Sequence, residues 1–146
     1  MQAAIAAAKE GLLADEVPVG AVIVNPSTNK IISTNYNLVE HRKDPTAHAE
    51  ILAIQSACQQ LSSKYLEGLD LFVTLQPCPM CMQAIIYSRI KRVYFGAYDP
   101  EIAINFSSTN HKPEIYGGIQ ETACKALLNN FFAEKRGSVH YIKVNT

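Results

Sequence analysis

The spacing of apolar positions in the first third of the chain predicts one helix followed by a β-hairpin. Residues 2–14 are rich in alanine and carry apolar side chains at helical intervals, which favours a helix. Residues 19–24 form an uninterrupted apolar run and predict a buried strand. Residues 25–29 are a turn cluster of Asn, Pro, Ser and Thr, so residues 31–34 are expected to form the returning strand.

The remaining pattern alternates helices with strands. Asp44 is expected to cap a helix whose first residue is Pro45 and which runs to about Leu61, because Asp suits the N-cap and Pro the first helical position. Further along the chain the pattern predicts a strand over 69–75, a helix from Cys78 and Pro79 to about Arg89, a short strand over 92–95 ended by Gly96, a loop over 99–113, and an amphipathic helix over 119–135.

This alternation predicts a three-layer α/β fold. The 146 residues are enough for one well-buried domain and not for two, so a single domain over residues 1–146 is expected. No apolar run approaches the roughly 18 residues that a membrane helix needs. The N-terminus lacks the features of a signal peptide, so we expect a cytoplasmic protein without a membrane partner.

The charge balance narrows the choice of partners. Lys and Arg together number 13, as do Asp and Glu, which gives a net charge of zero. A protein that binds nucleic acid without specificity usually carries a basic excess. The composition therefore disfavours strong nonspecific RNA binding and leaves room for a small, specific contact area.

The strongest chemical signal is a split motif, H-x-E followed by P-C-x-x-C. His48, Cys78 and Cys81 can occupy three of the four tetrahedral positions of Zn²⁺, which leaves one position open for water, as in catalytic zinc sites. Each ligand lies near the start of a predicted helix, where the positive end of the helix dipole favours thiolates. Glu50 stands beside a ligand and is free to move protons. Together these residues predict a zinc-dependent nucleobase deaminase, in which zinc lowers the pKa of water to about 7.

Two plainer interpretations compete with this one. His48 taken alone would be interpreted as a core histidine, but Glu50 and the two cysteines reverse that judgement. A structural zinc site would need a fourth protein ligand. The other candidate ligands show no recognisable pairing with the first three, and the two cysteines among them are expected to be small apolar filler; they are His41, Cys58, His111, Cys124 and His140.

Several further motifs resemble one known family. The matching segments are residues 16–24, 44–51, 73–75, 77–81, 88–93 and 95–99, together with Leu127-Leu128, Phe131-Phe132 and Arg136 near the C-terminus. From about residue 7 to 136 the chain resembles the bacterial tRNA-specific adenosine deaminases of the cytidine deaminase-like superfamily. The resemblance implies a five-stranded mixed sheet with helices on both faces and a homodimer. It also implies hydrolytic conversion of adenosine to inosine at the wobble position of a tRNA anticodon.

The resemblance also assigns residues that contact the substrate. Asn37 matches the family's base-contacting Asn, the backbone N–H of Ala49 would face the base, and Asp99 matches an Asp near the flanking nucleotide. Taken alone, Asn37 and Asp99 would be interpreted as turn residues.

Several features depart from the family pattern. The tail over 137–146 is only weakly basic, and the loop to Asn110 and His111 is short. Gln76 stands where the family usually has Glu, and Glu101 stands where it typically has a Lys that could meet a phosphate. Glu101 and the neutral charge support an alternative, a deaminase of a free nucleobase or nucleoside such as cytosine or guanine. A third possibility is a catalytically silent zinc-binding subunit that serves a partner deaminase, against which the intact Glu50 argues.

Overall fold

The computed structural model describes residues 1–102 and 112–145, with side chains up to residue 136. Its elements follow in the order α1 (Gln2–Leu13), β1 (Gly20–Asn25), β2 (Lys30–Tyr36), α2 (Val39–Arg42), α3 (Ala49–Leu61), β3 (Asp70–Leu75), α4 (Pro79–Tyr87), β4 (Arg92–Ala97), β5 (Glu114–Tyr116) and α5 (Glu121–Asn145). None of the helices in these described ranges has the length and apolar content needed to cross a bilayer.

The strands form one mixed sheet in the order β2-β1-β3-β4-β5. Strand β1 runs antiparallel to both β2 and β3, while β3, β4 and β5 are parallel to one another. The five-stranded mixed sheet implied by the family resemblance is therefore confirmed. Because β2 and the three parallel strands point the same way, their carboxyl ends meet at one edge of the sheet, where β1 begins.

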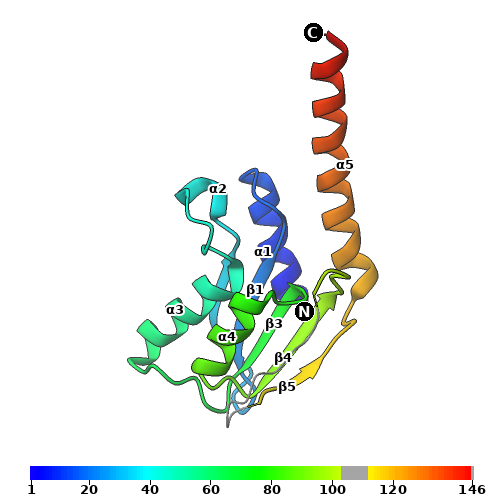
Figure 1. The fold of residues 1–146 in the computed structure, drawn as a ribbon. Coiled ribbons are helices and arrows are strands. Elements are labelled where there is room, and N and C mark those ends of the chain that lie inside the picture. The colour runs from blue at the N-terminus through cyan, green and yellow to red at the C-terminus, as the bar shows by residue number, and fades with distance from the viewer. Residues whose placement is uncertain (103–111, 146) are drawn as a thin grey trace.

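Helices cover both faces of the sheet, as Figure 1 shows. On one face, α1 lies so close to β1 that a Cβ on Gly20 would come within 2.0 Å of the Ala4 carbonyl oxygen, and α5 packs Cys124 against Gly96 of β4. On the other face lie α3 and α4, and the Ser33 hydroxyl of β2 donates a hydrogen bond to the Ala53 carbonyl of α3 at 2.9 Å. These layers confirm the predicted three-layer α/β class.

The hydrophobic core fixes the helices against the sheet. Strand side chains meet small residues of α3, which lets that helix approach closely; the buried set includes Ala21, Ile23, Leu71, Val73, Val93, Phe95, Ala49, Ala53 and Ala57. Cys124 is buried and Cys58 is partly buried against the same core, in keeping with their expected role as apolar filler.

Helix α3 begins later than the sequence predicted. The Asp44 carboxylate accepts hydrogen bonds from the backbone N–H of Thr46 at 2.8 Å and from its hydroxyl at 2.7 Å, which makes a local turn instead of a helix start. His48 has an extended backbone (φ −72°, ψ 151°) and is the N-cap residue, so Ala49 is the first helical residue. The predicted start at Pro45 is wrong, and the correction places His48 at the helix N-terminus.

Other boundaries also differ. Strand β4 continues through Gly96, which was expected to end it, because Ala97 still pairs with Leu75 of β3. The missing side chain of Gly96 leaves room for Cys124 of α5. The short elements α2 and β5 were not predicted, and β5 lies between the predicted loop over 99–113 and the predicted helix over 119–135. Helix α5 extends past residue 135 to Asn145. Most of the loop predicted over 99–113, including residues 103–111, lies outside the described residues.

Candidate active site

The topology gathers loops from distant parts of the chain at one edge of the sheet. Asn37 follows β2, Cys78 follows β3 and Asp99 follows β4, all at carboxyl ends, while Val19 precedes β1 at the same edge. This edge includes the point where the antiparallel β1 meets the parallel β3, and such switch points favour ligand sites because connections diverge there. The residues that the motifs assign to metal and substrate binding thus lie at the edge of the sheet where a ligand site is expected.

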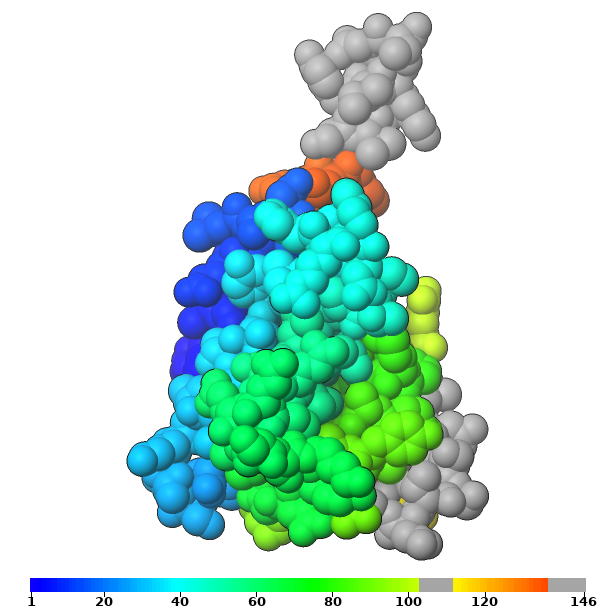
Figure 2. All heavy atoms as spheres, turned by 90° about the vertical axis from the view of Figure 1, so that its left-hand side faces the viewer, coloured from blue at the N-terminus to red at the C-terminus, as the bar shows by residue number. Residues whose placement is uncertain are grey.

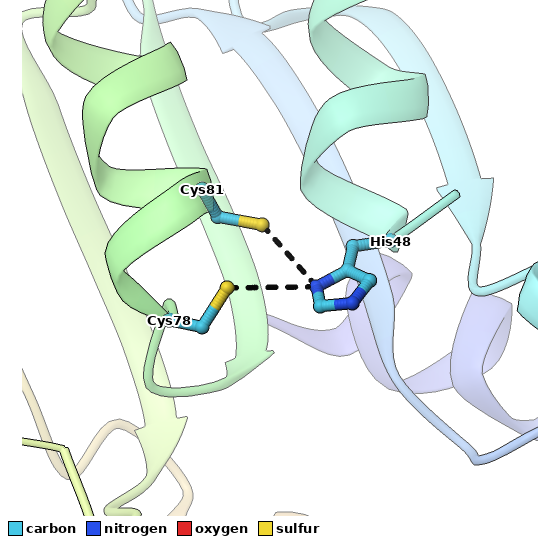
Figure 3. A group of neighbouring side chains, drawn as sticks. All are labelled: His48, Cys78 and Cys81. Atoms are coloured by element: carbon cyan, nitrogen blue, oxygen red, sulfur yellow. Dashed lines mark hydrogen bonds between the residues drawn. The ribbon is translucent and has the colours of Figure 1, made fainter. Parts of the chain in front are cut away.

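Three potential ligand atoms converge between the N-termini of α3 and α4. The Nδ1 atom of His48 lies 3.6 Å from Sγ of Cys78 and 3.5 Å from Sγ of Cys81, and all three atoms lie within 4.8 Å of one another. Figure 3 shows the imidazole turned toward both sulfurs. Pro79 is the first residue of α4, so Cys78 takes the N-cap position and Cys81 the third helical position, on the same side.

These distances fit a shared metal ion. With metal–sulfur and metal–nitrogen bonds of about 2.3 and 2.0–2.1 Å at tetrahedral angles, a bound Zn²⁺ requires N···S separations of about 3.6 Å. The two observed separations, 3.5 and 3.6 Å, match that edge length. The chain therefore holds a His/Cys/Cys group positioned for metal binding. Among the residues that the structure describes, no fourth His, Cys, Asp or Glu belongs to this group.

The two thiols share a hydrogen bond, which favours one thiolate and one thiol in the pair. A hydrogen bond with the Cys81 thiol, helped by His48, lowers the pKa of Cys78 to about 5 despite partial burial. The same hydrogen bond and burial raise the pKa of Cys81, which keeps its proton. A thiolate is the form that ligates a metal, so the pair offers one thiolate to a metal and would release its remaining proton on binding.

Glu50 lies in the first turn of α3, next to the ligand group. Its side chain is buried, and burial raises the pKa of its carboxyl group, opposed by its own backbone N–H, by His48 and by a hydrogen bond with Cys81. It also lines a cavity of about 340 Å³. A buried carboxyl group at the wall of a cavity is suited to hold and move protons.

The cavity collects most of the residues that the sequence singled out. Its lining includes His48, Ala49, Glu50, Cys78, Asn37 and Asp99. Cys81 is buried and does not line it. The remaining walls are mainly apolar and come from Val17, Val19, Val39, Glu40, Leu75, Gln76 and Ile102. A small apolar cavity with a few polar groups is the usual form of a small-molecule site.

Asn37 is a buried residue rather than an exposed turn residue. Its backbone N–H donates to the Val19 carbonyl at 3.1 Å, which fixes it at the cavity wall. Within the described residues, its side-chain amide has no hydrogen-bond partner. The amide thus keeps its hydrogen-bonding capacity for a ligand.

Gln76 and Asp99 link two loops of the cavity. The backbone N–H of Asp99 donates to Oε1 of Gln76 at 3.0 Å, and the Gln76 N–H donates to the Ala97 carbonyl at 2.8 Å. The Asp99 carboxylate accepts the N–H of the exposed Glu101 at 3.0 Å. Gln76 is thus a cavity residue that holds the Asp99 loop. The sequence marked it only as a departure from a family pattern.

Sequence reasoning also missed the structural role of Glu16, a buried carboxylate that accepts the backbone N–H groups of Glu40 and His41. This residue belongs to the segment 16–24 of the family pattern, but nothing local indicated a contact with residues 40 and 41. The signal in the sequence was the position of Glu16, a carboxylate between the predicted helix over 2–14 and the apolar run over 19–24, where the chain would be expected to be buried.

The chain is similar over most of its length to known deaminases. It matches the family model of MafB19-like deaminases over residues 1–136. It is 40% identical over 147 residues to the tRNA-specific adenosine deaminase of Rickettsia typhi, and the alignment covers 95% of this chain and 99% of that protein.

Solved structures agree with this similarity. A structure from work on A-to-I editing by tRNA:A34 deaminases at the wobble position of transfer RNA matches with a TM-score of 0.82 and 39% identity, over 88% of this chain and 97% of that chain. A guanine deaminase from Bacillus subtilis matches with a TM-score of 0.62 and 40% identity, over 66% of this chain and 61% of that chain.

Proposed function

This chain belongs to the tRNA-specific adenosine deaminase family, as its motifs predicted. On that premise, we propose that it hydrolyses adenosine to inosine at the wobble position of a tRNA anticodon. The observation that carries the proposal is the convergence of His48, Cys78 and Cys81 beside the buried Glu50 at a cavity of about 340 Å³. A cavity of this size suits one nucleotide turned out of a loop.

Zn²⁺ is the metal that best fits this donor set. One nitrogen and two sulfur ligands in a tetrahedral arrangement are typical of zinc, and three protein ligands are typical of catalytic sites. When bound, Zn²⁺ would supply Lewis acidity that makes a water molecule a nucleophile at neutral pH.

The chain's own residues would handle binding and protons. Glu50 accepts the proton of the attacking water and passes protons to the ring nitrogen of adenine and to the departing ammonia, so that adenosine and water give inosine and ammonia. Asn37 would hydrogen-bond the base through its amide. The N–H of Ala49, the first residue of α3, has no partner within its helix and would face the base as well. Asp99 would contact the flanking nucleotide.

The assembly is proposed as a homodimer of one deaminase domain spanning residues 1–146, located in the cytoplasm, where tRNA is modified. The exposed face of α4 supports a self-contact, since Met80 and Tyr87 are 36% and 71% exposed. Apolar and aromatic side chains of this kind are enriched in subunit interfaces.

A free-base deaminase is the second candidate. It would use His48, Cys78, Cys81 and Glu50 in the same roles and would need no RNA contacts. The zero net charge and the exposed Glu101, an acidic group on the cavity's Asp99 loop, favour it. The similarity to a guanine deaminase supports the same chemistry on a free base.

Ammonia release from zinc-loaded protein distinguishes the two candidates. The substrates are an anticodon stem-loop with adenosine at the wobble position, the same stem-loop with that adenosine moved one position, and free cytosine, guanine and adenosine. We expect turnover only on the wobble stem-loop. Turnover on a free base alone would reject the tRNA substrate while leaving the deaminase chemistry intact.

Metal analysis tests the ligand set separately. Cys81→Ser should lower the zinc content of the purified protein and abolish turnover. Cys58→Ser is the matched control, because Cys58 lies on α3 outside the ligand group and should keep a full complement of zinc. Full zinc binding by Cys81→Ser would rule out this ligand set.

A further inference from the structure

A completely buried carboxylate lies behind the cavity wall. Glu16, in the connection between α1 and β1, is 0% exposed. Its Oε1 accepts the backbone N–H of Glu40 at 3.0 Å and its Oε2 accepts the N–H of His41 at 2.7 Å, with the His41 ring nitrogen Nδ1 at 3.6 Å. These contacts join segments 24 and 25 residues apart in the sequence.

The two N–H groups are those that a helix cap normally satisfies. Helix α2 has one turn, and Glu40 and His41 are its second and third residues. Its N-cap residue is Leu38, whose side chain has no acceptor atom, so no side chain caps the helix locally. Glu16 supplies the missing acceptors from another part of the chain, and its negative charge suits the positive end of the helix.

Helix α2 depends on such anchoring because it is short and superficial. No residue of α2 is buried, and a single turn is too short to be stable alone. Figure 2 shows this segment, in cyan, at the surface of the domain. Two further backbone hydrogen bonds hold the start of this segment. The Leu38 N–H donates to the Ala47 carbonyl at 3.0 Å, one residue before His48, and the Asn37 N–H donates to the Val19 carbonyl at 3.1 Å.

The anchored segment forms part of the cavity. Asn37, Val39 and Glu40 line it from the α2 side, and Val17 and Val19, on either side of Pro18, line it from the connection that carries Glu16. Together with the Asn37–Val19 hydrogen bond, Glu16 therefore fixes the relative position of two walls that face the same ligand.

We propose that Glu16 is a positioning residue that holds the α2 wall, including Asn37, against the 17–19 wall and thereby sets the affinity of the cavity for its nucleobase. The inference rests on the proposed function, since it assumes that this cavity takes the substrate base. Glu16 has no role in metal binding, because it belongs to no described metal-ligand group and lies behind the wall rather than in it.

The variant Glu16→Gln isolates this role. An amide of nearly the same size offers one acceptor oxygen, so one of the two N–H groups would face an NH₂ donor. Losing a charged hydrogen bond of this kind should raise KM for the wobble stem-loop about tenfold or more, with zinc content unchanged and kcat within a few-fold of the parent. Glu10→Gln, the same change on the exposed face of α1, is the control and should alter none of these quantities.

Hydrogen exchange gives a readout that does not require activity. In Glu16→Gln the amides of residues 38–43 should exchange at least tenfold faster, while those of α3 keep their protection. If the parent protein fails to act on the stem-loop, the proposed function fails, and this local loosening still supports the anchoring of α2 by Glu16.

Three outcomes would overturn the proposal: loss of zinc, an unchanged KM with or without a fall in kcat, or unchanged exchange at residues 38–43. If Glu16→Gln does not fold, Glu16→Asp serves in its place, because it keeps the charge and both oxygens but is shorter by one methylene. It should show a smaller KM increase in the same direction, and an unchanged KM would overturn the proposal equally.

Discussion

Replacing Glu50 with Gln removes a proton acceptor while changing the packing very little. Glu50 is 4% exposed and is fixed in the first turn of α3. Gln has nearly the same shape, so the change should leave the backbone and the ligand group in place. An uncharged amide also avoids the cost of burying a carboxylate, so the unfolding temperature should not fall.

The expected loss of rate follows from the chemistry assigned to Glu50. General acid–base assistance is typically worth about 10²–10⁴-fold, which corresponds to about 2.7–5.5 kcal/mol in the activation barrier. Glu50 would act in more than one proton transfer, so the upper half of this range is expected. The other carboxylates that line the cavity are Glu40 of α2 and Asp99 after β4, and neither belongs to the ligand group.

Single-turnover deamination of the wobble stem-loop measures the chemical step directly. Zinc analysis and thermal unfolding, run on the same preparations, show whether the site and fold are intact. Glu67→Gln, an equivalent change at an exposed position, is the control. A Glu50→Gln protein that retains zinc and turns over within tenfold of the parent would refute the assignment of Glu50 as the proton carrier.

Three further predictions concern packing and the cavity loops. Gly20→Ala would bring a Cβ within 2.0 Å of the Ala4 carbonyl oxygen, so thermal unfolding should report a loss of at least about 1–3 kcal/mol. Gln76→Ala removes the acceptor of the Asp99 N–H and should raise KM about five-fold with zinc retained, whereas Gln76→Glu keeps an acceptor and should lie near the parent. Glu101→Lys should strengthen RNA binding in a low-salt gel-shift titration; no change would mean that Glu101 points away from the RNA.

The sequence predicted the elements with strong periodicity and missed those held by distant contacts. Buried runs such as the one that became β1 follow from their own residues. Helix α2 does not, because its first-turn N–H groups are satisfied by Glu16, far away in the sequence. Strand β5 has three residues, and its only described sheet partner is β4, so its own composition carries little signal.

The helix start at Pro45 was wrong because two local rules compete at Asp44. Asp followed by Pro suits a helix N-terminus, but the Asp44 side chain can also bond Thr46 in a compact turn, and the structure has that turn. The choice is settled by tertiary structure, which requires His48 at a helix end facing the two cysteines. The spacing of apolar residues along the chain contains no information about where His48 must lie relative to the cysteines.

Some residues of the candidate site could likewise be predicted from local sequence, and others depend on distant contacts. The ligand trio was predictable because C-x-x-C and H-x-E constrain chemistry within a few residues of sequence. The place of Gln76 in the cavity depends on the Asp99 N–H, which only the parallel pairing of β3 and β4 brings within reach. Sequence alone marked that residue as unusual and could not say what it contacts.

The residues of the candidate site come from two kinds of element, packed helices and the connections at the sheet edge. The ligand trio and Glu50 lie at the N-termini of α3 and α4, on helices packed into the core, whereas Asn37, Gln76 and Asp99 belong to connections at the sheet edge. Connections tolerate change better than packed helices do. Two of the departures from the family pattern, Gln76 and Glu101, contact Asp99 through hydrogen bonds. Under the proposed function, the metal chemistry would stay constant while the Asp99 loop would decide whether the cavity accepts a base held in RNA or a free one, which is the distinction that the stem-loop assay measures.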